Sequence, residues 1–149
     1  MPADKKPLPD FMALYQRWAE LKPGPKAELR RIARPQDLIE VPAFYRLSFG
    51  LDADRNDWML RLVYCLPCIT HASDAGGLGK ALAKAGISEK RLFAVIRSEQ
   101  PNDLIQLRRL MQQAKPTLNW ALCAKQLYYW NDLAKRALLE EYFLYQQHA

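Results

Sequence analysis

The stretch WMLRLVYCLPCI, residues 58–69, is the longest apolar segment of the sequence that fits a helix. Its apolar side chains cover most sides of such a helix, which is typical of a helix buried at the centre of a fold. Pro67 should kink or end it. Loop-forming sequences flank it, GLDADRND (50–57) before and HASDAGG (71–77) after. We therefore expect the central buried helix of the protein here.

The sequence before this segment reads as three short helices. Asp10 can cap a first helix that runs to about Lys22, and its apolar stripe consists of Phe11, Leu14, Tyr15, Trp18 and Leu21. The triplet Pro23-Gly24-Pro25 ends it, and Pro25 suits the first position of a second helix that runs to about Ala33. After the short turn PQDLIE, Pro42 can open a third helix, PAFYRLSF.

The sequence after the central segment also has helical periodicity. Further helices are expected at about 78–85, 88–98, 102–114 and 118–147, the last with a break near residue 131. Ser88 and Asn102 are the expected N-caps of the second and third of these. Because no stretch alternates convincingly with period two, the pattern predicts an all-α fold: two small helical bundles packed into one compact subunit.

A chain of 149 residues fits one domain or two small helical subdomains that share a core. We expect a flexible, proline-rich N-terminus over 1–9, an N-terminal bundle over 10–75 and a C-terminal bundle over 76–149. The polar start predicts no secretory signal, and no apolar run approaches the roughly 20 residues of a membrane span. Three cysteines do not suggest a disulfide framework. These features predict a cytoplasmic protein.

Basic residues are concentrated in two segments. The net charge is +6, and residues 22–34 carry five cations against Glu28 alone. Residues 75–115 carry eight cations against three carboxylates. A generic solvated surface mixes its signs more thoroughly, so this distribution favours a polyanionic partner such as nucleic acid.

The motif CLPC (Cys65, Cys68), with His71 nearby, raises the possibility of a redox or zinc protein. A thioredoxin-type site needs a strand that leads into a helix N-terminus, whereas these cysteines lie late in an apolar helix. A zinc site needs four ligands, and the other candidates, Cys123 and His148, lack paired spacing. We interpret the cysteines as core residues and expect no metal site and no cofactor.

Other catalytic motifs are incomplete. The segment GGLGKALAK resembles a phosphate-binding loop, but Asp74 and Ala81 replace the required glycine and hydroxyl residue, so we interpret its glycines as a hinge. The carboxylates Glu140 and Glu141 are expected to face solvent. The rings of LYYW (127–130) could stack on bases, although packing in the core is the favoured interpretation. The sequence therefore predicts no catalytic residues and no enzyme.

Helical geometry directs several cations away from the apolar faces. At about 100° per residue, Arg31 and Arg109 project nearly opposite the apolar faces of their helices, and Arg30 and Arg108 lie at the flanks. On the helix over 88–98, Lys90, Arg91 and Arg97 also lie off the core face. Arginine suits phosphate because its planar fork donates two hydrogen bonds at once. A phosphate-binding surface is therefore favoured over plain solvated faces.

Three segments carry a family resemblance: ALYQRWAEL (13–21), LRRIARPQDLIEVPAFYRL (29–47) and 78–130, which includes LRRL and the downstream tryptophan. In this order they resemble the small subunit of Cascade, the type I-E CRISPR surveillance complex, a family often called CasB. The match weakens only at 50–77 and at the N-terminus.

The resemblance implies an all-helical, non-catalytic subunit whose partners are CRISPR RNA, target DNA, the backbone and large subunits of Cascade, and a second copy of itself stacked head to tail. It implies backbone contacts to the RNA–DNA heteroduplex and to the displaced non-target strand of the R-loop, because base pairing reads the sequence. The basic residues that the family places toward nucleic acid correspond to Arg31, Arg55, Arg91 and Arg109, with Arg30, Arg97, Arg108, Lys135 and Arg136 as weaker candidates.

Two departures from the family pattern concern the displaced strand: Gln100 stands where relatives can carry arginine, and the 66–77 loop is short and poor in lysine.

Two alternative functions of other classes remain. One is a small redox or zinc protein that uses Cys65 and Cys68, and the other is a helical adaptor that binds only protein.

Overall fold

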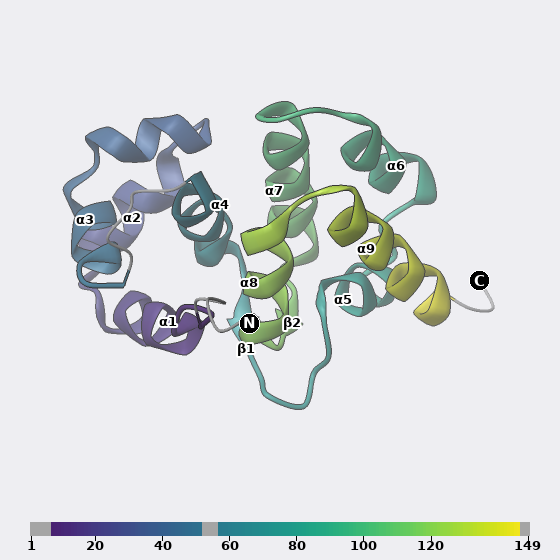
Figure 1. Cartoon of the computed structure of the whole chain (residues 1–149), viewed down its shortest axis with the longest axis horizontal. Helices are drawn as coiled ribbons and strands as arrows, with labels where there is room; N and C mark the ends of the chain where they lie inside the picture. The colour runs from purple at the N-terminus through teal and green to yellow at the C-terminus, as the bar shows by residue number, and fades with distance from the viewer. Residues whose placement is uncertain (1–6, 52–56, 147–149) are drawn as a thin grey trace, which may run out of the picture.

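Helix α4 (Asp57–Cys65) lies between the two halves of the computed structural model, in which residues 7–51 and 57–146 are described (Figure 1). Leu62, Val63 and Cys65 are completely buried, which confirms the expected central helix. The helix ends at Cys65 and continues as the 3-10 turn η2 (Leu66–Cys68), as the proline at 67 predicts.

The elements before α4 are α1 (Phe11–Glu20), α2 (Pro23–Arg31), the 3-10 helix η1 (Pro35–Glu40) and α3 (Pro42–Ser48). Asp10 caps α1 by accepting a hydrogen bond from the amide of Ala13 at 2.9 Å, as expected. The second helix begins at Pro23 rather than Pro25. Both prolines fit its first turn, where no amide donor is needed.

The elements after η2 are α5 (Leu78–Lys84), α6 (Glu89–Arg97), α7 (Asn102–Ala114), α8 (Trp120–Tyr129) and α9 (Asp132–Tyr145). Ser88 caps α6, and the predicted break lies between α8 and α9, where Asn131 caps α9. The expected cap at Asn102 is wrong: Pro101 holds the cap position and makes no side-chain hydrogen bond there.

Among the described residues, the exception to the helical architecture is a pair of two-residue parallel strands, β1 (Thr70–His71) and β2 (Thr117–Leu118). Thr70 pairs with Thr117 and His71 with Leu118. The side chain of His71 accepts a hydrogen bond from the amide of Trp120 at 2.9 Å. This short ladder ties the segment after η2 to the start of α8. Segments of two residues carry no detectable alternation, which is why the sequence did not predict them.

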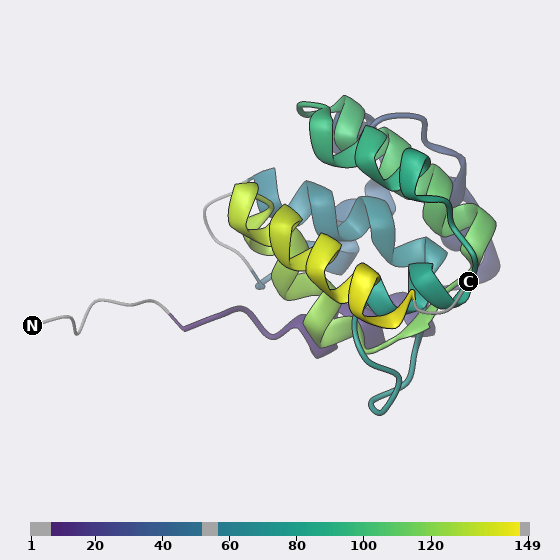
Figure 2. The same ribbon diagram turned by 90° about the vertical axis from the view of Figure 1, so that its right-hand side faces the viewer.

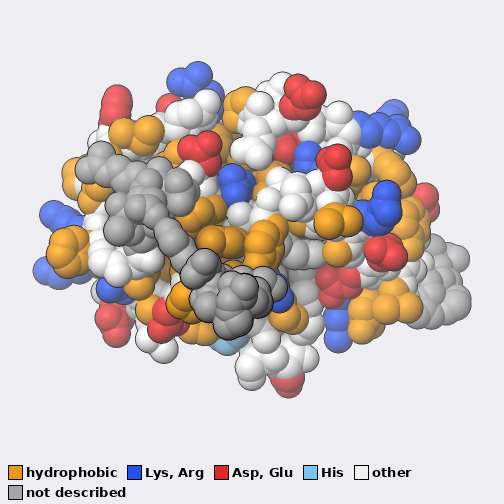
Figure 3. All heavy atoms as spheres, in the orientation of Figure 1, with side chains coloured by type: hydrophobic (Ala, Val, Ile, Leu, Met, Phe, Trp, Pro, Cys, Tyr) orange, Lys and Arg blue, Asp and Glu red, His pale blue; other side chains and the backbone are white. Residues whose placement is uncertain are grey.

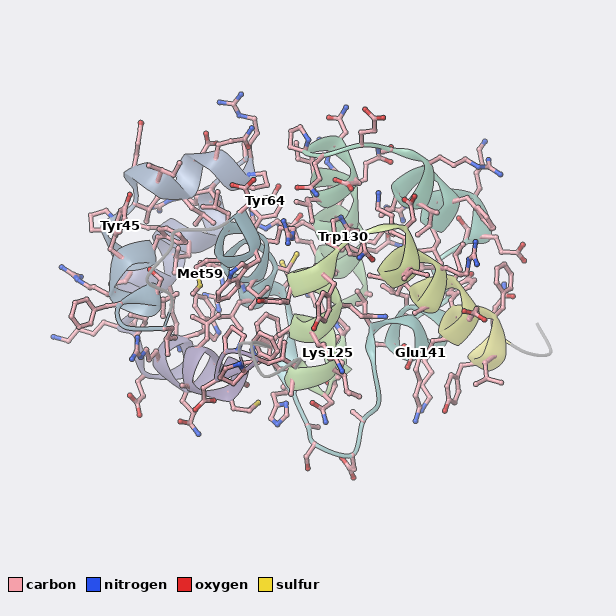
Figure 4. All side chains as sticks on the ribbon, viewed as in Figure 1. Tyr45, Met59, Tyr64, Lys125, Trp130 and Glu141 are labelled. Atoms are coloured by element: carbon pink, nitrogen blue, oxygen red, sulfur yellow. The ribbon has the colours of Figure 1, made fainter. Side chains whose placement is uncertain are left out.

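Helices α5 and α9 pack closely through the glycines of GGLGK. A Cβ at Gly79 would lie 2.7 Å from the carbonyl oxygen of Leu138 in α9. The Glu141 carboxylate accepts hydrogen bonds from the amides of Gly77 and Gly79, both at 3.1 Å, so it caps α5 (Figure 4). The expectation that Glu141 faces solvent is therefore wrong, whereas Glu140 is exposed.

The two halves of the chain are joined by helix α8, which packs against both α1 and α4 (Figures 1 and 2). The indole of Trp120 is fully buried and donates to the carbonyl of Phe11 at 2.9 Å. In return, Arg61 of α4 donates to the carbonyls of Leu127 and Tyr128 at the end of α8, both at 2.6 Å. The buried apolar residues form one continuous core. A division of the chain at 75/76 into two bundles stays a prediction.

Among the described helices, none is long and apolar enough to cross a membrane.

Candidate nucleic-acid interface

The clearest pair of neighbouring predicted site residues lies between α6 and α7, which pack side by side (Figure 2). Leu107 and Leu110 are buried on the core face of α7, and this fixes Arg109 on its exposed side. Arg91, exposed on α6, and Arg109 line one hollow of about 180 Å³. The Arg91 guanidinium donates to the side chain of Gln113 on α7. Two exposed arginines from adjacent helices thus border one hollow.

A second group of cations lies on the last turn of α2. Arg30 and Arg31 are both exposed. The Arg30 guanidinium lies 5.3 Å from the centroid of the Trp18 ring, and the Lys26 ammonium lies 5.6 Å from the same ring. Such cation–π contacts hold a cation in place without neutralising it. Arg30 therefore remains available to an anion, and Arg31 is available because it is exposed.

Arg108 is not an exposed cation, which corrects the expectation that it flanks the outer face of its helix. Only 3% of it is exposed, and its guanidinium donates to the carbonyls of Ile32 (2.5 Å), Leu29 (3.0 Å) and Arg30 (3.2 Å). It also lies 4.5 Å from the centroid of the Tyr64 ring. Arg108 thus caps the carboxyl end of α2 and holds the turn that carries Arg30.

Tyr64 completes this junction. Its hydroxyl donates to the carbonyl of Ala33 at 2.7 Å, and Figure 4 shows it on α4 beside α7. Burial raises the pKa of Tyr64, while the neighbouring Arg108 lowers it in part. The neutral phenol is therefore the stable form, and it donates to the same chain end that Arg108 holds.

Lys135 is also used within the chain. Its ammonium lies 2.9 Å from the Asp103 carboxylate and donates to the carbonyl of Ser98 at 3.0 Å, with 12% of the side chain exposed. Asp103 is completely buried and also accepts from the indole of Trp130 at 2.9 Å. Because a buried carboxylate needs a counter-charge, Lys135 neutralises Asp103 and fixes the start of α9 against α7.

Of the remaining predicted site residues, Arg97 and Arg136 lie on the surface of the described part of the chain. Arg97 is exposed at the end of α6 and lies 4.9 Å from the centroid of the Phe93 ring. Arg136 is exposed on α9. Arg55 lies outside the described residues. Gln100, which was expected to depart from the family pattern, is exposed.

Lys115 belongs to the basic segment over 75–115 but was not predicted as a site residue. It is exposed directly after α7 and adopts a left-handed backbone conformation (φ 46°). Glycine or asparagine is usual at this position after a helix, so a lysine here is uncommon. The sequence feature that could have indicated Lys115 as a site residue is its position directly after the helix that carries Arg109.

The cysteines are placed as core residues rather than as a reactive pair. Cys65 and Cys123 are completely buried, and Cys68 is half-buried. Burial raises the pKa of the Cys65 thiol, and it raises the pKa of Cys123 to about 12. A reactive thiol needs the opposite shift. Among the described residues, no group of three histidine, cysteine or carboxylate side chains could hold a metal ion.

The LYYW segment divides between core and surface. Leu127 and Trp130 are buried, whereas Tyr129 is 49% exposed beside the exposed Leu122 and Leu133. These residues belong to α8, α9 and the loop between them. On the face that Figure 3 shows, cations and carboxylates are interspersed among apolar side chains. The visible part of this face therefore carries no continuous basic patch.

Comparisons with known proteins show the family of the chain. The family described as CRISPR-associated protein Cse2 matches residues 25–143. CRISPR system Cascade subunit CasB of Escherichia coli K12 is 40% identical, over 91% of this chain and 93% of its own. A chain in the crystal structure of E. coli Cascade bound to a PAM-containing double-stranded DNA target superposes with a TM-score of 0.87 at 38% identity, covering 93% of this chain and 97% of that one. The protein therefore belongs to the Cse2 (CasB) family of Cascade subunits of CRISPR systems.

Proposed function

We propose that the protein is a non-catalytic, nucleic-acid-binding subunit of a Cascade complex. In that complex it stabilises the crRNA–target heteroduplex and the displaced non-target strand through contacts to their phosphate backbones. The observation that carries the proposal is the exposure of Arg31 and Arg109 on helices whose opposite faces are buried. Arg91 lines the same hollow as Arg109 and extends the same chemistry. The similar chain in DNA-bound E. coli Cascade supports this role.

The contacts are of a kind that reads no sequence. Arginine side chains on the solvent side of rigid helices can form bidentate hydrogen bonds to phosphate oxygens. Such contacts add affinity for any strand, whereas the guide RNA supplies specificity by base pairing. We assign the surface role to Arg31, Arg91 and Arg109 first, and to Arg30, Arg97 and Arg136 second. We propose as partners the backbone and large Cascade subunits, a second copy of the chain, CRISPR RNA and target DNA, all in the cytoplasm.

Two rival functions have less support. A redox or zinc protein would require an accessible, low-pKa thiol, and the Cys65 and Cys123 thiols have the opposite properties. A protein-only adaptor would not need arginines paired from adjacent helices around one hollow. This rival predicts that DNA does not bind the chain in a salt-dependent way.

The test uses a reconstituted Cascade with the double variant Arg31→Ala/Arg109→Ala. We expect normal assembly and normal pairing with a short single-stranded target, but at least tenfold weaker binding to a duplex target, because only the duplex produces a displaced strand. The matched control is Arg34→Ala/Arg46→Ala, which removes two exposed arginines outside the proposed set. Equal losses in both variants, or no loss in either, would refute the assignment.

A further inference from the structure

A second polar hollow lies on the other side of α7 and is larger than the arginine pair's site. Its volume is about 400 Å³, in the range of ligand pockets. We call it the α2–α7 pocket. The lining residues that matter to its chemistry are Trp18, Arg30, Thr70, Arg108, Gln112 and Lys115. Three of these six carry a positive charge, and none of the residues that line the pocket is a carboxylate.

From this we infer that the α2–α7 pocket binds a phosphate group. The central reason is Arg108, a guanidinium that is 3% exposed and has no carboxylate partner among the described ion pairs. Its terminal nitrogens donate to backbone carbonyls, which satisfy hydrogen bonds but leave the positive charge in place. Its Nε is buried and has no hydrogen-bond partner in the described part of the chain. The carbonyls at the negative end of α2 compensate only part of this buried charge, and an anion in the adjoining pocket would compensate more of it.

The other cations have the positions that an anion site needs. Arg30 lies over Trp18, which limits the conformations of its side chain. Lys115 directly follows the last residue of α7 and lines the same pocket from the opposite helix. Thr70 and Gln112 add neutral hydrogen-bond donors. Together they could bind a tetrahedral oxyanion from several sides, as arginine, lysine and hydroxyl groups do in other phosphate sites.

For a free phosphate compound the inference goes beyond the proposed function, because the pocket is complete in the isolated chain and needs no other Cascade subunit. For a backbone phosphate it rests on the proposed function, to which Arg30 already belongs. Two sources share the chemistry. The ligand is either a free phosphate compound or one phosphate of a nucleic-acid backbone that runs past α2 and α7.

The left-handed conformation of Lys115 allows a variant that separates binding from folding. Glycine adopts φ 46° without strain, so Lys115→Gly should fold at least as stably as the wild type while it loses a cation of the pocket. Arg30→Gln is a second variant, since this exposed side chain can change without opening the core. Lys125→Ala is the charge-matched control, because Lys125 is exposed on α8 and lines a different hollow (Figure 4).

The experiment measures the thermal midpoint of the isolated protein while inorganic phosphate replaces chloride at constant ionic strength. We expect a saturable rise, about 4 °C when phosphate reaches roughly twenty times its dissociation constant. The rise should persist in Lys125→Ala and be lost or halved in Lys115→Gly and Arg30→Gln. No rise in the wild type, or an equal rise in all four proteins, would overturn the inference.

A second arm adds a short oligothymidine to the phosphate titration. If the oligonucleotide competes with phosphate and Lys115→Gly weakens its binding, the pocket takes a backbone phosphate. If the phosphate titration is unchanged, the pocket takes a free phosphate compound. Either result keeps the site. The proposed function is tested separately, by the loss of duplex binding in Arg31→Ala/Arg109→Ala. Failure of the proposed function and failure of the pocket can therefore be told apart.

Discussion

Replacing Arg108 with alanine should destabilise the protein far more than replacing its neighbour Arg109. Arg108 makes three hydrogen bonds to carbonyls at the end of α2, at 2.5, 3.0 and 3.2 Å, and it packs on the Tyr64 ring. Hydrogen bonds to a charged group contribute about 1.5–3 kcal/mol each, but they are not additive within one network. Removing the buried charge also relieves part of its desolvation cost. The expected net loss is therefore about 3–4 kcal/mol of unfolding free energy.

The assay is urea unfolding of the isolated chain, followed by far-ultraviolet circular dichroism. For the Arg108→Ala variant we expect a lower midpoint with an unchanged slope, because the folded state keeps its surface and only its stability changes. In a protein of this size the loss corresponds to a fall of about 10 °C in the thermal midpoint. Arg109→Ala, an exposed change one residue away, should stay within about 0.5 kcal/mol of the wild type.

Arg108→Lys tests the geometric part of the reasoning. A lysine keeps the charge but cannot span three carbonyls with a planar fork, so it should recover less than half of the lost stability. If the Arg108→Ala and Arg109→Ala variants have equal unfolding midpoints, Arg108 is not the structural link between α7 and α2. Assigning Arg108 a structural role, different from that of the surface arginines, would then be wrong.

Three further predictions concern the core and the α5–α9 pair. Burial raises the pKa of Cys123 to about 12, so only about one Cys123 thiol in ten thousand is ionised at pH 8. Iodoacetamide should therefore label Cys123 in concentrated urea but not in the folded protein. Labelling of the folded protein would contradict the burial of this thiol. Gly79→Ala should lower the free energy of unfolding by about 1–3 kcal/mol in thermal unfolding, because the new Cβ would lie 2.7 Å from the backbone of α9. An increase in stability would show that α9 moves away to make room for the methyl group. Glu141→Ala should cost about 1 kcal/mol through the lost cap of α5, whereas Glu140→Ala should be nearly neutral, and equal midpoints would refute the capping role.

The helix boundaries followed closely from local sequence signals. The cap at Asp10, the cap at Ser88 and the break before Asn131 are set by nearest neighbours, so the sequence alone predicted them correctly. The cap at Asn102 failed because the backbone of Pro101 takes the cap position, which a residue preference does not reveal. Local signals therefore predicted the elements well and their end details less well.

The candidate site was harder to predict, because helical periodicity describes one helix at a time. The wheel of α7 separated Arg109 from the core correctly, but it could not show that the end of α2 packs on the flank that carries Arg108. The same limit applies to Lys135, whose partner Asp103 comes from another helix, and to Glu141, which caps α5. Long-range polar contacts of this kind became visible only in three dimensions.

The salt dependence of duplex-target binding tests the central claim most directly, since phosphate contacts release counterions. The measurement compares reconstituted Cascade containing the wild-type chain with the same complex containing Arg31→Ala/Arg109→Ala, over a range of salt concentrations. If each arginine contacts a phosphate of the displaced single strand, the log–log slope should become less steep by about 1.4, that is about 0.7 for each lost contact. Parallel slopes, with the variant subunit present in the complex, would contradict the account.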